Sequence, residues 1–594
     1  MESNRKKFIS NNKIIAAFFI MLLGILIAFR FDYYYDLNDD LVMKDIVAGV
    51  YTGIPNGHNI QMLYPISVLI SIAYRLIRPI PWYGIFILIC QFGCLFLIAG
   101  RIASYFKAIW SKCLAVLVEL VLIGAFFLYE FVFTQYTVTA AILGATAVFL
   151  LYTTKQELHW KDFIKQNIIS ILLVILAYQI RTEMLLLLFP IICVVGICKW
   201  ANEEHIVTKE NLKKYLILIG AILAGMLLSQ GINKIAYGSQ EWASFLSFFD
   251  SRTQLYDFQT IPEFNENRAF YEGIGLKQSE QQLLENYNFG FDNKINVDTM
   301  KATAAYAKAN QQEGQTLASH LKENIKTYLY MVFSDHNEKL PWISFIILIY
   351  ILLFLLAFIG REYSFLWKLP FLAFVRSISW LYIIHLNRFP PRITHSLYFV
   401  ELLVLCGMIL ELRKDVRVRL EEHNNMLSRI LLEVPFIMIC ILSVIYLPTG
   451  VKYVQTEYDR REVVNEEYLA LQTYCADHAD QVYLMDVYST VAYSEKMFRS
   501  SKNLLANYEY LGGWVSKSPI DRDKLYALGI SSIEDAACNQ NNVSIVTHHV
   551  KRDIDWLNFY LQEQGYAKEA KKVDEIKSNG SIVFDVYQIV DIDL

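Results

Sequence analysis

The sequence predicts an α-helical polytopic membrane protein with about eleven transmembrane helices, followed by an α/β domain outside the membrane. Two observations predict the membrane part: 55% of the 594 residues are hydrophobic, and long apolar runs recur along the chain. Each run approaches the ~20 residues that a helix needs to cross the hydrocarbon core of a bilayer. The third observation is a change after Pro448, where polar residues and short strand-like runs replace the apolar segments.

The first apolar run follows three basic residues, Arg5 to Lys7, and resembles a signal peptide. No small-residue cleavage site follows Phe29, so we expect this run to be retained as the first span. The other spans are predicted from apolar runs of similar length. The predicted spans are residues 14–30, 82–100, 113–130, 137–153, 167–181, 184–198, 215–231, 342–360, 369–386, 396–411 and 430–447.

The run Met62–Ile77 is either a twelfth span or a helix lying flat on the membrane surface. Pro65 interrupts its start, and Arg75 and Arg78 follow closely. Cytoplasmic loops of membrane proteins carry an excess of Lys and Arg. If this run lies flat, basic loops and basic-poor loops alternate cleanly along the chain, and if it spans, that order is lost. We therefore expect a multi-pass protein of the cell membrane with a cytoplasmic N-terminus and an extracytoplasmic C-terminus.

Two regions outside the spans are long enough to fold. We assign residues 1–447 to a transmembrane domain, which includes a first outer loop with the interfacial helix (31–81) and a large outer loop (231–341). Residues 448–594 form the predicted C-terminal domain. Its α/β character follows from strand-like runs and one amphipathic helix that stops at a glycine. The strand-like runs are residues 481–488, 543–550 and 580–590, and the helix is 553–565.

Cysteine usage and net charge add few constraints. Only Cys475 and Cys538 lie in a polar region, where they either form one disulfide or remain free thiols, and no cysteine pair has convincing zinc-finger spacing. The net charge of −4 says little about partners, since the distribution of charge among the loops matters more. We expect the lipid bilayer as a partner and no nucleic acid.

Polar and charged residues recur at the ends of the spans that this topology places outside. Charges at membrane depth are costly and are usually functional. The two acidic residues after the first span are the candidate catalytic residues, and the others are candidate substrate-binding residues. The catalytic candidates are Asp39 and Asp40, and the binding candidates are Gln135, Arg181, Glu183, Asp250, Arg252, His336, Arg388 and Arg392.

Each candidate also has a structural interpretation. The adjacent aspartates could cap a helix, where the helix dipole favours negative charge. Arg181 could extend to the lipid headgroups, with Glu183 neutralising it. The arginines beside Pro390-Pro391 could anchor headgroups, although two guanidinium groups there also suit a phosphate. The segment that contains Asp250 could form a salt bridge within its loop, and His336 could be ordinary polar surface.

One chemical task fits the whole set: transfer of a sugar from a lipid-linked phosphosugar whose tail stays in the bilayer. Arginine side chains would bind the phosphate and stabilise its charge as it leaves. Aromatic and polar loop residues would hold the sugar. Asp39 or Asp40 would accept the proton of the acceptor hydroxyl. A single in-line displacement would invert the configuration at the sugar.

Several motifs resemble the GT-C superfamily of polytopic glycosyltransferases, in particular an uncharacterised bacterial branch of it. The acidic first loop, residues 38–83 from Asn38-Asp39-Asp40 to Pro81-Trp82-Tyr83, carries most of this resemblance. The further similar motifs are FTQYTVTA (133–140), IRTEM (180–184), YEGIGLKQSE (271–280), NYNFGFD (286–292), NRFPPRITHSLY (387–398) and YLGGWVSKSP (510–519).

The resemblance implies a polyprenyl-phosphate sugar donor, transfer outside the cytoplasmic membrane, and a cell-surface polymer or glycolipid as the acceptor. It places the first-loop carboxylate of the superfamily at Asp39 or Asp40, and it agrees with Met62–Ile77 lying flat. Some members use a divalent cation, which the acidic pair could bind, so a metal ion stays possible here.

Three alternatives stay open at this stage. A transporter or flippase should show repeated halves and polar residues at the middle of its spans, whereas here the polar groups cluster at the outer ends. A polysaccharide polymerase or ligase would depend on a large outer loop with Arg and His, which this chain has. A catalytically silent scaffold could bind wall polymer through its outer domain.

Overall fold

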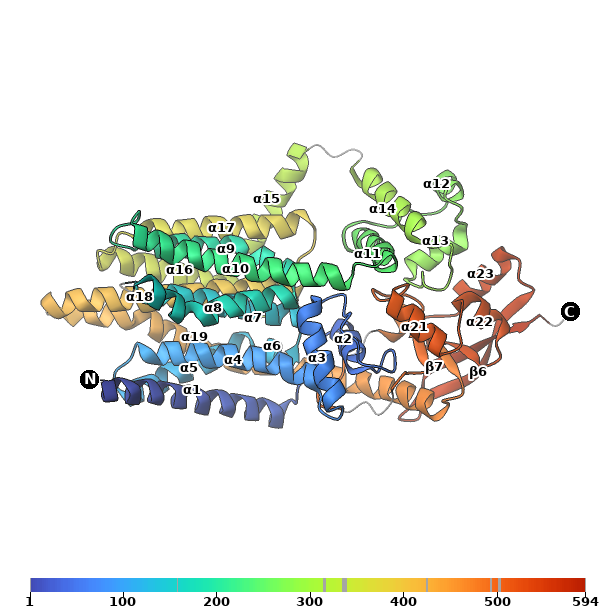
Figure 1. Ribbon diagram of the computed structural model, residues 1–594, viewed down its shortest axis with the longest axis horizontal. Helices are drawn as coiled ribbons and strands as arrows, with labels where there is room; N and C mark the ends of the chain where they lie inside the picture. Colours follow the sequence, from blue (N-terminus) through green and yellow to red (C-terminus); the bar gives the residue numbers. More distant parts are fainter. Residues whose placement is uncertain are drawn as a thin grey trace.

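The computed structural model describes residues 2–156, 159–312, 317–333, 339–423, 426–491, 494–499 and 504–592. A bundle of long, roughly parallel helices occupies one end of the molecule, and a smaller body of helices and strands occupies the other (Figure 1). Among the described residues, ten helical segments are long and apolar enough to cross a membrane, which is the architecture of a multi-pass membrane protein. They are Asn11–Arg30, Trp82–Ser104, Ile109–Phe126, Trp160–Ile180, Thr182–Ala201, Lys209–Ala236, Trp342–Ile359, Phe365–His385, Pro391–Lys414 and Glu433–Asp477.

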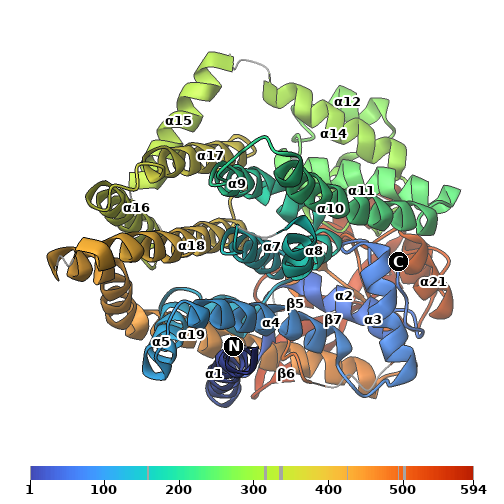
Figure 2. The same cartoon turned by 60° about the vertical axis from the view of Figure 1, so that its left-hand side comes forward.

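These segments belong to helices that coincide with ten of the eleven predicted spans. The bundle helices are α1 (Glu2–Arg30), α4 (Trp82–Ser104), α5 (Ile109–Phe126), α8 (Trp160–Ile180), α9 (Thr182–Ala201), α10 (Lys209–Ala236), α16 (Trp342–Ile359), α17 (Phe365–His385), α18 (Pro391–His423) and α19 (Met426–Asp477). The remaining predicted span is α7 (Tyr136–Tyr152), which has 17 residues, all of them buried. It packs against α4, α8, α9 and α18 in the middle of the bundle (Figure 2). A helix that is apolar on every side belongs in such a position.

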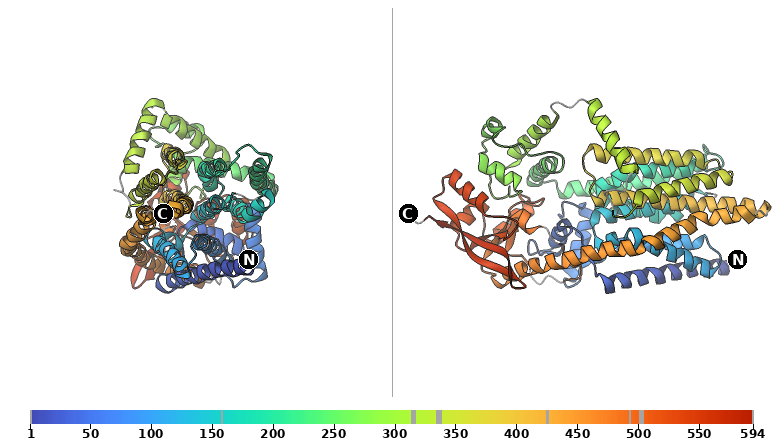
Figure 3. Two further views of the ribbon diagram at one scale, coloured as in Figure 1. Left: turned by 90° about the vertical axis from the view of Figure 1, so that its left-hand side faces the viewer. Right: turned by 180° about the vertical axis from the view of Figure 1, so that it is seen from behind.

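The first outer loop covers the end of the bundle. It contains β1 (Tyr34–Tyr35), α2 (Asn38–Ala48) and α3 (Tyr64–Leu76), and β1 pairs in parallel with β2 (Phe133–Thr134), which follows the short helix α6 (Leu128–Val132). Helix α3 runs crosswise to the bundle helices (Figures 1 and 3). This arrangement agrees with the predicted interfacial helix rather than with a twelfth span. Its exposed apolar residues, such as Leu69 and Leu76, suit contact with lipid.

The large outer loop is helical and begins later than predicted, because α10 continues past residue 231 to Ala236. It contains α11 (Gln240–Phe258), α12 (Arg268–Gly273), α13 (Gln278–Glu285), α14 (Val297–Gln312) and α15 (Leu317–Phe333). The last two helices cover residues 297–333, apart from the undescribed residues 313–316.

The C-terminal region forms a five-stranded mixed sheet with helices, so the predicted sheet is confirmed. The strand order is β4-β3-β5-β7-β6, with β3 parallel to β4 and β5, and β7 antiparallel to β5 and β6. Helix α19 passes through Pro448 and reaches Asp477, so one continuous helix joins the membrane to this domain (Figure 3). The elements are β3 (Val482–Met485), α20 (Val487–Thr490), β4 (Tyr508–Tyr510), α21 (Pro519–Ala527), α22 (Ile533–Asn539), β5 (Val543–His548), α23 (Asp555–Gln564), β6 (Lys568–Ser578) and β7 (Ser581–Asp591).

The large outer loop and the C-terminal domain share one hydrophobic core, although the sequence suggests two separate regions. Phe248 and Phe289 from the loop belong to the same buried cluster as Leu484 and Leu557 from the domain. Two of the motifs noted in the sequence interlock here. The backbone N–H of Gly290 donates to the carbonyl of Leu511 at 2.7 Å. A side chain at Gly512 would place its Cβ 1.8 Å from the carbonyl oxygen of Tyr287, so only glycine fits.

The first outer loop is tied to the same body. Lys44 on α2 forms a 2.7 Å ion pair with Glu495, and both side chains are almost fully buried. The backbone N–H of Met497 donates to the carbonyl of Tyr33, and that of Ala506 donates to the carbonyl of Val50. These bonds fix the orientation of α2 against the C-terminal domain.

Candidate functional site

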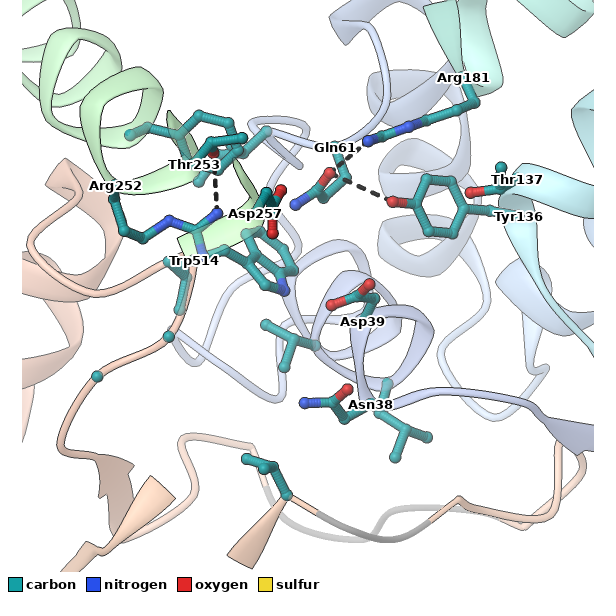
Figure 4. A pocket seen from close by; sticks show the side chains of 18 of the residues that line it. Asn38, Asp39, Gln61, Tyr136, Thr137, Arg181, Arg252, Thr253, Asp257 and Trp514 are labelled. Atoms are coloured by element: carbon teal, nitrogen blue, oxygen red, sulfur yellow. Dashed lines mark hydrogen bonds between the residues drawn. The ribbon is translucent and has the colours of Figure 1, made fainter. Parts of the chain in front are cut away.

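A cavity of about 640 Å³ lies where the end of the bundle, the first outer loop, the large outer loop and the C-terminal domain meet. Figure 4 shows part of its lining, with side chains from the first outer loop, the helix bundle, the large outer loop and the C-terminal domain. Most of the candidate residues from the sequence line it. They are Asp39, Arg181, Glu183, Asp250, Arg252, Arg388 and Arg392.

Asp39 is the acidic residue that faces this cavity. It lies in the first turn of α2 and is half-buried. The N-terminal end of a helix favours a negative charge at this place. Within the described part of the chain, its carboxylate has no hydrogen-bond or ion-pair partner. A carboxylate in this position is available to accept a proton from a bound molecule.

Asp40 does not line the cavity. Only 1% of it is exposed, and its Oδ1 accepts hydrogen bonds from the Tyr83 hydroxyl at 2.7 Å and the Tyr136 backbone N–H at 3.2 Å. Burial raises the pKa of this carboxyl well above its usual range. Asp40 therefore fastens α2 to α4 and α7. Of the two aspartates between which the sequence left the candidate catalytic role open, Asp39 lines the cavity, whereas Asp40 does not and holds the helices together.

Arg181 and Arg388 enter the cavity already paired. Arg181 donates from Nη1 to Gln61 Oε1 at 2.5 Å, and its Nε lies 3.0 Å from Glu183 Oε2. Its guanidinium also lies over the Tyr136 ring, 5.3 Å from the centroid. Arg388 forms an ion pair with Asp257.

Arg392 differs from these two arginines. It is the second residue of α18, and Pro391 at the first helical position fixes the start of that helix. Within the described residues, its guanidinium forms no hydrogen bond and no ion pair. An unpaired guanidinium in a cavity suits a phosphate, whose oxygens match its donors.

Helix α11 supplies Asp250, Arg252 and Asp257 to one wall. Arg252 is 7% exposed, donates to the Tyr287 hydroxyl and to Thr253 Oγ1, and has a buried Nε without a partner. Burial, and then the charge of Glu183, raise the pKa of Asp250. Sequence reasoning missed Asp257, although it follows Asp250 by seven residues, the spacing that returns to one face of a helix.

One sequence-based assignment does not line this cavity, and another lies outside the described residues. Gln135 is fully buried and caps α7, because its Oε1 accepts from the backbone N–H groups of Thr137 and Val138. It is therefore a helix cap rather than a substrate-binding residue. His336 lies outside the residues that the structure describes.

The C-terminal domain forms the opposite wall, which the sequence did not predict. The lining residues follow directly after β3, at Val487 and Tyr488, and after β4, at Gly512 to Trp514. Ligands of open α/β sheets bind outside the carboxyl ends of the parallel strands. Here these ends point at the charged residues of the bundle.

The described residues contain no group of three or more His, Cys, Asp or Glu side chains that could hold a metal ion. No step proposed below runs through a metal. Cys475 and Cys538 are both buried free thiols, in different hydrophobic clusters, and do not pair.

The fold and this cavity define a multi-pass membrane protein with a polar site between its helix bundle and an α/β domain. Comparison of the chain with models of known protein families, with curated proteins and with solved structures gives no match. The function is therefore argued from the site.

Proposed function

We propose that this chain is a membrane glycosyltransferase. It transfers a sugar from a polyprenyl-phosphate donor to a polymer or glycolipid at the outer face of the cell membrane. The topology predicted from the basic loops places the cavity on that side. The position of the cavity at the end of the bundle supports a donor whose prenyl tail stays among the lipids while its head enters the cavity.

One observation carries this proposal: the carboxylate of Asp39 and the guanidinium of Arg392 line the same cavity, and neither has a partner among the described residues. A protein buries or half-buries such charges at a cost unless they have partners. A sugar phosphate and an acceptor hydroxyl supply both partners at once. The phosphate takes the place beside Arg392, and the hydroxyl takes the place beside Asp39.

In the proposed reaction the acceptor oxygen attacks the anomeric carbon of the donor sugar. The bond between that carbon and the phosphate oxygen breaks as the new glycosidic bond forms. Asp39 takes the proton of the acceptor hydroxyl. Arg392, with Arg181 and Arg388 beside it, stabilises the negative charge on the departing polyprenyl phosphate. A single displacement of this kind inverts the anomeric configuration.

The test is a transfer assay with the full chain in lipid nanodiscs, labelled polyprenyl-phosphate sugars, and surface polysaccharide of the producing cell as the acceptor. We expect Asp39→Asn to lower the transfer rate by about 10²- to 10⁴-fold, because the amide cannot accept the proton. Asp298→Asn is the matched control, since Asp298 is an exposed aspartate in the first turn of α14, away from the cavity. A properly folded Asp39→Asn protein with wild-type activity would contradict the proposal.

The products of the same assay separate the alternatives. A single-sugar transferase leaves free polyprenyl phosphate and an acceptor longer by one residue. A polymerase or ligase moves a whole glycan in one step. A transporter changes the side on which the donor is found and forms no new glycosidic bond.

A further inference from the structure

A second cavity, of about 700 Å³, lies on the C-terminal domain next to the first. It forms beyond the carboxyl end of β5, and its lining includes Asn286, His549, Arg552 and Trp556. One contact connects the linings of the two cavities. The guanidinium of Arg552 lies over the ring of Tyr488, 5.5 Å from the centroid, and Tyr488 lines the first cavity.

The sheet topology explains why the cavities adjoin. Strand β3 lies between β4 and β5 and is parallel to both, so the carboxyl ends of all three strands share one edge. The first cavity uses the segments after β3 and β4, and the second uses the segment after β5. The chain leaves β3 for one neighbour and later returns to the other, which is the arrangement that opens a ligand crevice.

The side chains along this edge offer both stacking faces and hydrogen bonds. The ring of Tyr488 is 45% exposed between the two cavities, and Trp514 lines the first. Trp556 lines the second, is only 6% exposed, and has a buried indole N–H without a hydrogen-bond partner. The amide, imidazole and guanidinium groups of Asn286, His549 and Arg552 add donors and acceptors.

We propose that the two cavities form one continuous groove, which holds an extended carbohydrate chain as the acceptor. The reactive end of the chain lies beside Asp39, and the following sugars cross Tyr488 and fill the second cavity. This inference rests on the proposed function for the reactive end only. Binding of the chain depends on the C-terminal domain.

The chemistry of the groove favours a carbohydrate over other ligands. Sugar rings present an apolar face that stacks on aromatic rings, and hydroxyl groups that both donate and accept hydrogen bonds. A peptide strand would add to an exposed edge strand, β4 or β6, whereas the groove lies at the ends of strands. A lipid chain would need an apolar groove, and this one is rich in polar side chains.

The experiment compares short and long acceptors prepared by partial hydrolysis of the surface polysaccharide of the producing cell. Full-length protein in nanodiscs is assayed as wild type, Tyr488→Ala, Tyr488→Phe and Arg552→Ala, with Lys571→Ala on the exposed strand β6 as the control. We expect Tyr488→Ala and Arg552→Ala to raise KM about five- to tenfold for long acceptors, because each removes one stacking contact. KM for short acceptors and kcat should stay unchanged in Arg552→Ala, because Arg552 lines only the second cavity. Tyr488→Phe, which keeps the ring, should restore the KM for long acceptors relative to Tyr488→Ala.

The result that would overturn the groove is an equal change of KM for short and long acceptors, or no change for either. If no transfer occurs even in the wild-type protein, the proposed function fails. The groove is then tested by binding of the same fragments to the full chain, followed by tryptophan fluorescence. Binding that strengthens with fragment length and weakens in Tyr488→Ala supports the groove, and binding that is independent of length refutes it.

Discussion

The polar cavity described above and an apolar cavity inside the helix bundle differ in the side chains that line them. The cavity at the end of the bundle, about 640 Å³, is lined by charged side chains from segments far apart in the sequence. The other, about 490 Å³, lies between α4, α5, α18 and α19 and is lined mainly by apolar side chains. Its exceptions are the buried Glu119 and, at one end, the 2.7 Å ion pair of Arg413 with Glu433.

This difference concerns the positions of charged side chains that have no partner. Among the described residues, the charged side chains of Asp39 and Arg392 have no partner and line the cavity that borders the C-terminal domain, whereas the apolar cavity contains one buried carboxyl group without a hydrogen-bond partner, that of Glu119. Inside the bundle, ionisable side chains such as Arg376 and Glu401 pair with each other, at 2.7 Å, and line neither cavity. A transport path needs polar groups along the middle of the spans. The apolar cavity offers hydrocarbon instead, so the comparison favours chemistry at the end of the bundle.

Among the tests of this comparison, the largest expected effect comes from removing the charge of Arg392, which lines the polar cavity without a partner among the described residues. We expect Arg392→Gln to lower kcat/KM for the polyprenyl-phosphate donor about ten- to a hundredfold, because it removes a charged hydrogen bond to the phosphate. Arg392→Lys should recover part of this loss, since the ammonium keeps the charge but not the paired donors. The measurement is initial transfer rate at donor concentrations below KM.

The matched control for this substitution is Arg268→Gln. Arg268 is 71% exposed in the large outer loop and pairs only with Glu272, one turn away on the same helix. Its loss should leave transfer unchanged. If both variants keep wild-type kcat/KM, the donor phosphate does not bind at Arg392, and the functional contrast between the two cavities disappears.

A smaller effect tests how the C-terminal wall is held against the first loop. Asp521 on α21 is buried, accepts from the Tyr51 hydroxyl at 3.3 Å and from the Lys517 backbone N–H at 2.6 Å, and lies near the Glu509–Lys524 ion pair. Burial, and then the charge of Glu509, raise the pKa of Asp521 to about 7. The folded protein therefore retains a proton that the unfolded chain releases above the usual aspartate pKa of about 4.

Because the folded state binds more protons, stability falls as pH rises from about 4 to about 7 through this group. We expect the unfolding temperature to drop by a few degrees between pH 5 and pH 8, and Asp521→Asn to reduce that drop. The measurement is thermal unfolding by tryptophan fluorescence in detergent micelles. Asp523→Asn, an exposed position on the same helix, is the control. An equal drop in unfolding temperature in the wild type, Asp521→Asn and Asp523→Asn would show that Asp521 does not couple folding to pH.

Sequence patterns predicted the features that depend on local chemistry. Spans follow from apolar runs, and the flat helix α3 follows from the prolines and arginines around it. The candidate residues at the ends of the spans are predictable because charges at membrane depth are costly and are usually functional. The sequence could not separate Asp39 from Asp40, because the choice depends on the rotation of α2, which Tyr83 and Tyr136 set through Asp40.

The features that the sequence could not predict depend on contacts between segments far apart in the chain. The sequence predicts Gln135 as a substrate-binding residue, because a helix cap and a binding residue can have the same polar side chain. The wall at Tyr488 and Trp514 could not be predicted, because it requires the domain to dock on the large outer loop. The close approach that requires Gly290 and Gly512 in that contact is evident only when both segments are placed together.

The smallest expected effect lies in the apolar cavity, at Glu119. It is 7% exposed, and both carboxyl oxygens are buried without a hydrogen-bond partner among the described residues. An ionisable residue inside a membrane is a functional candidate by default. However, Glu119 lies away from the polar cavity and neither of its carboxyl oxygens has a hydrogen-bond partner among the described residues, so we expect Glu119→Gln, which keeps the shape, to change kcat/KM for transfer less than about twofold. A loss of about tenfold or more, in protein that unfolds at the wild-type temperature, would mean that the apolar cavity also takes part in the reaction.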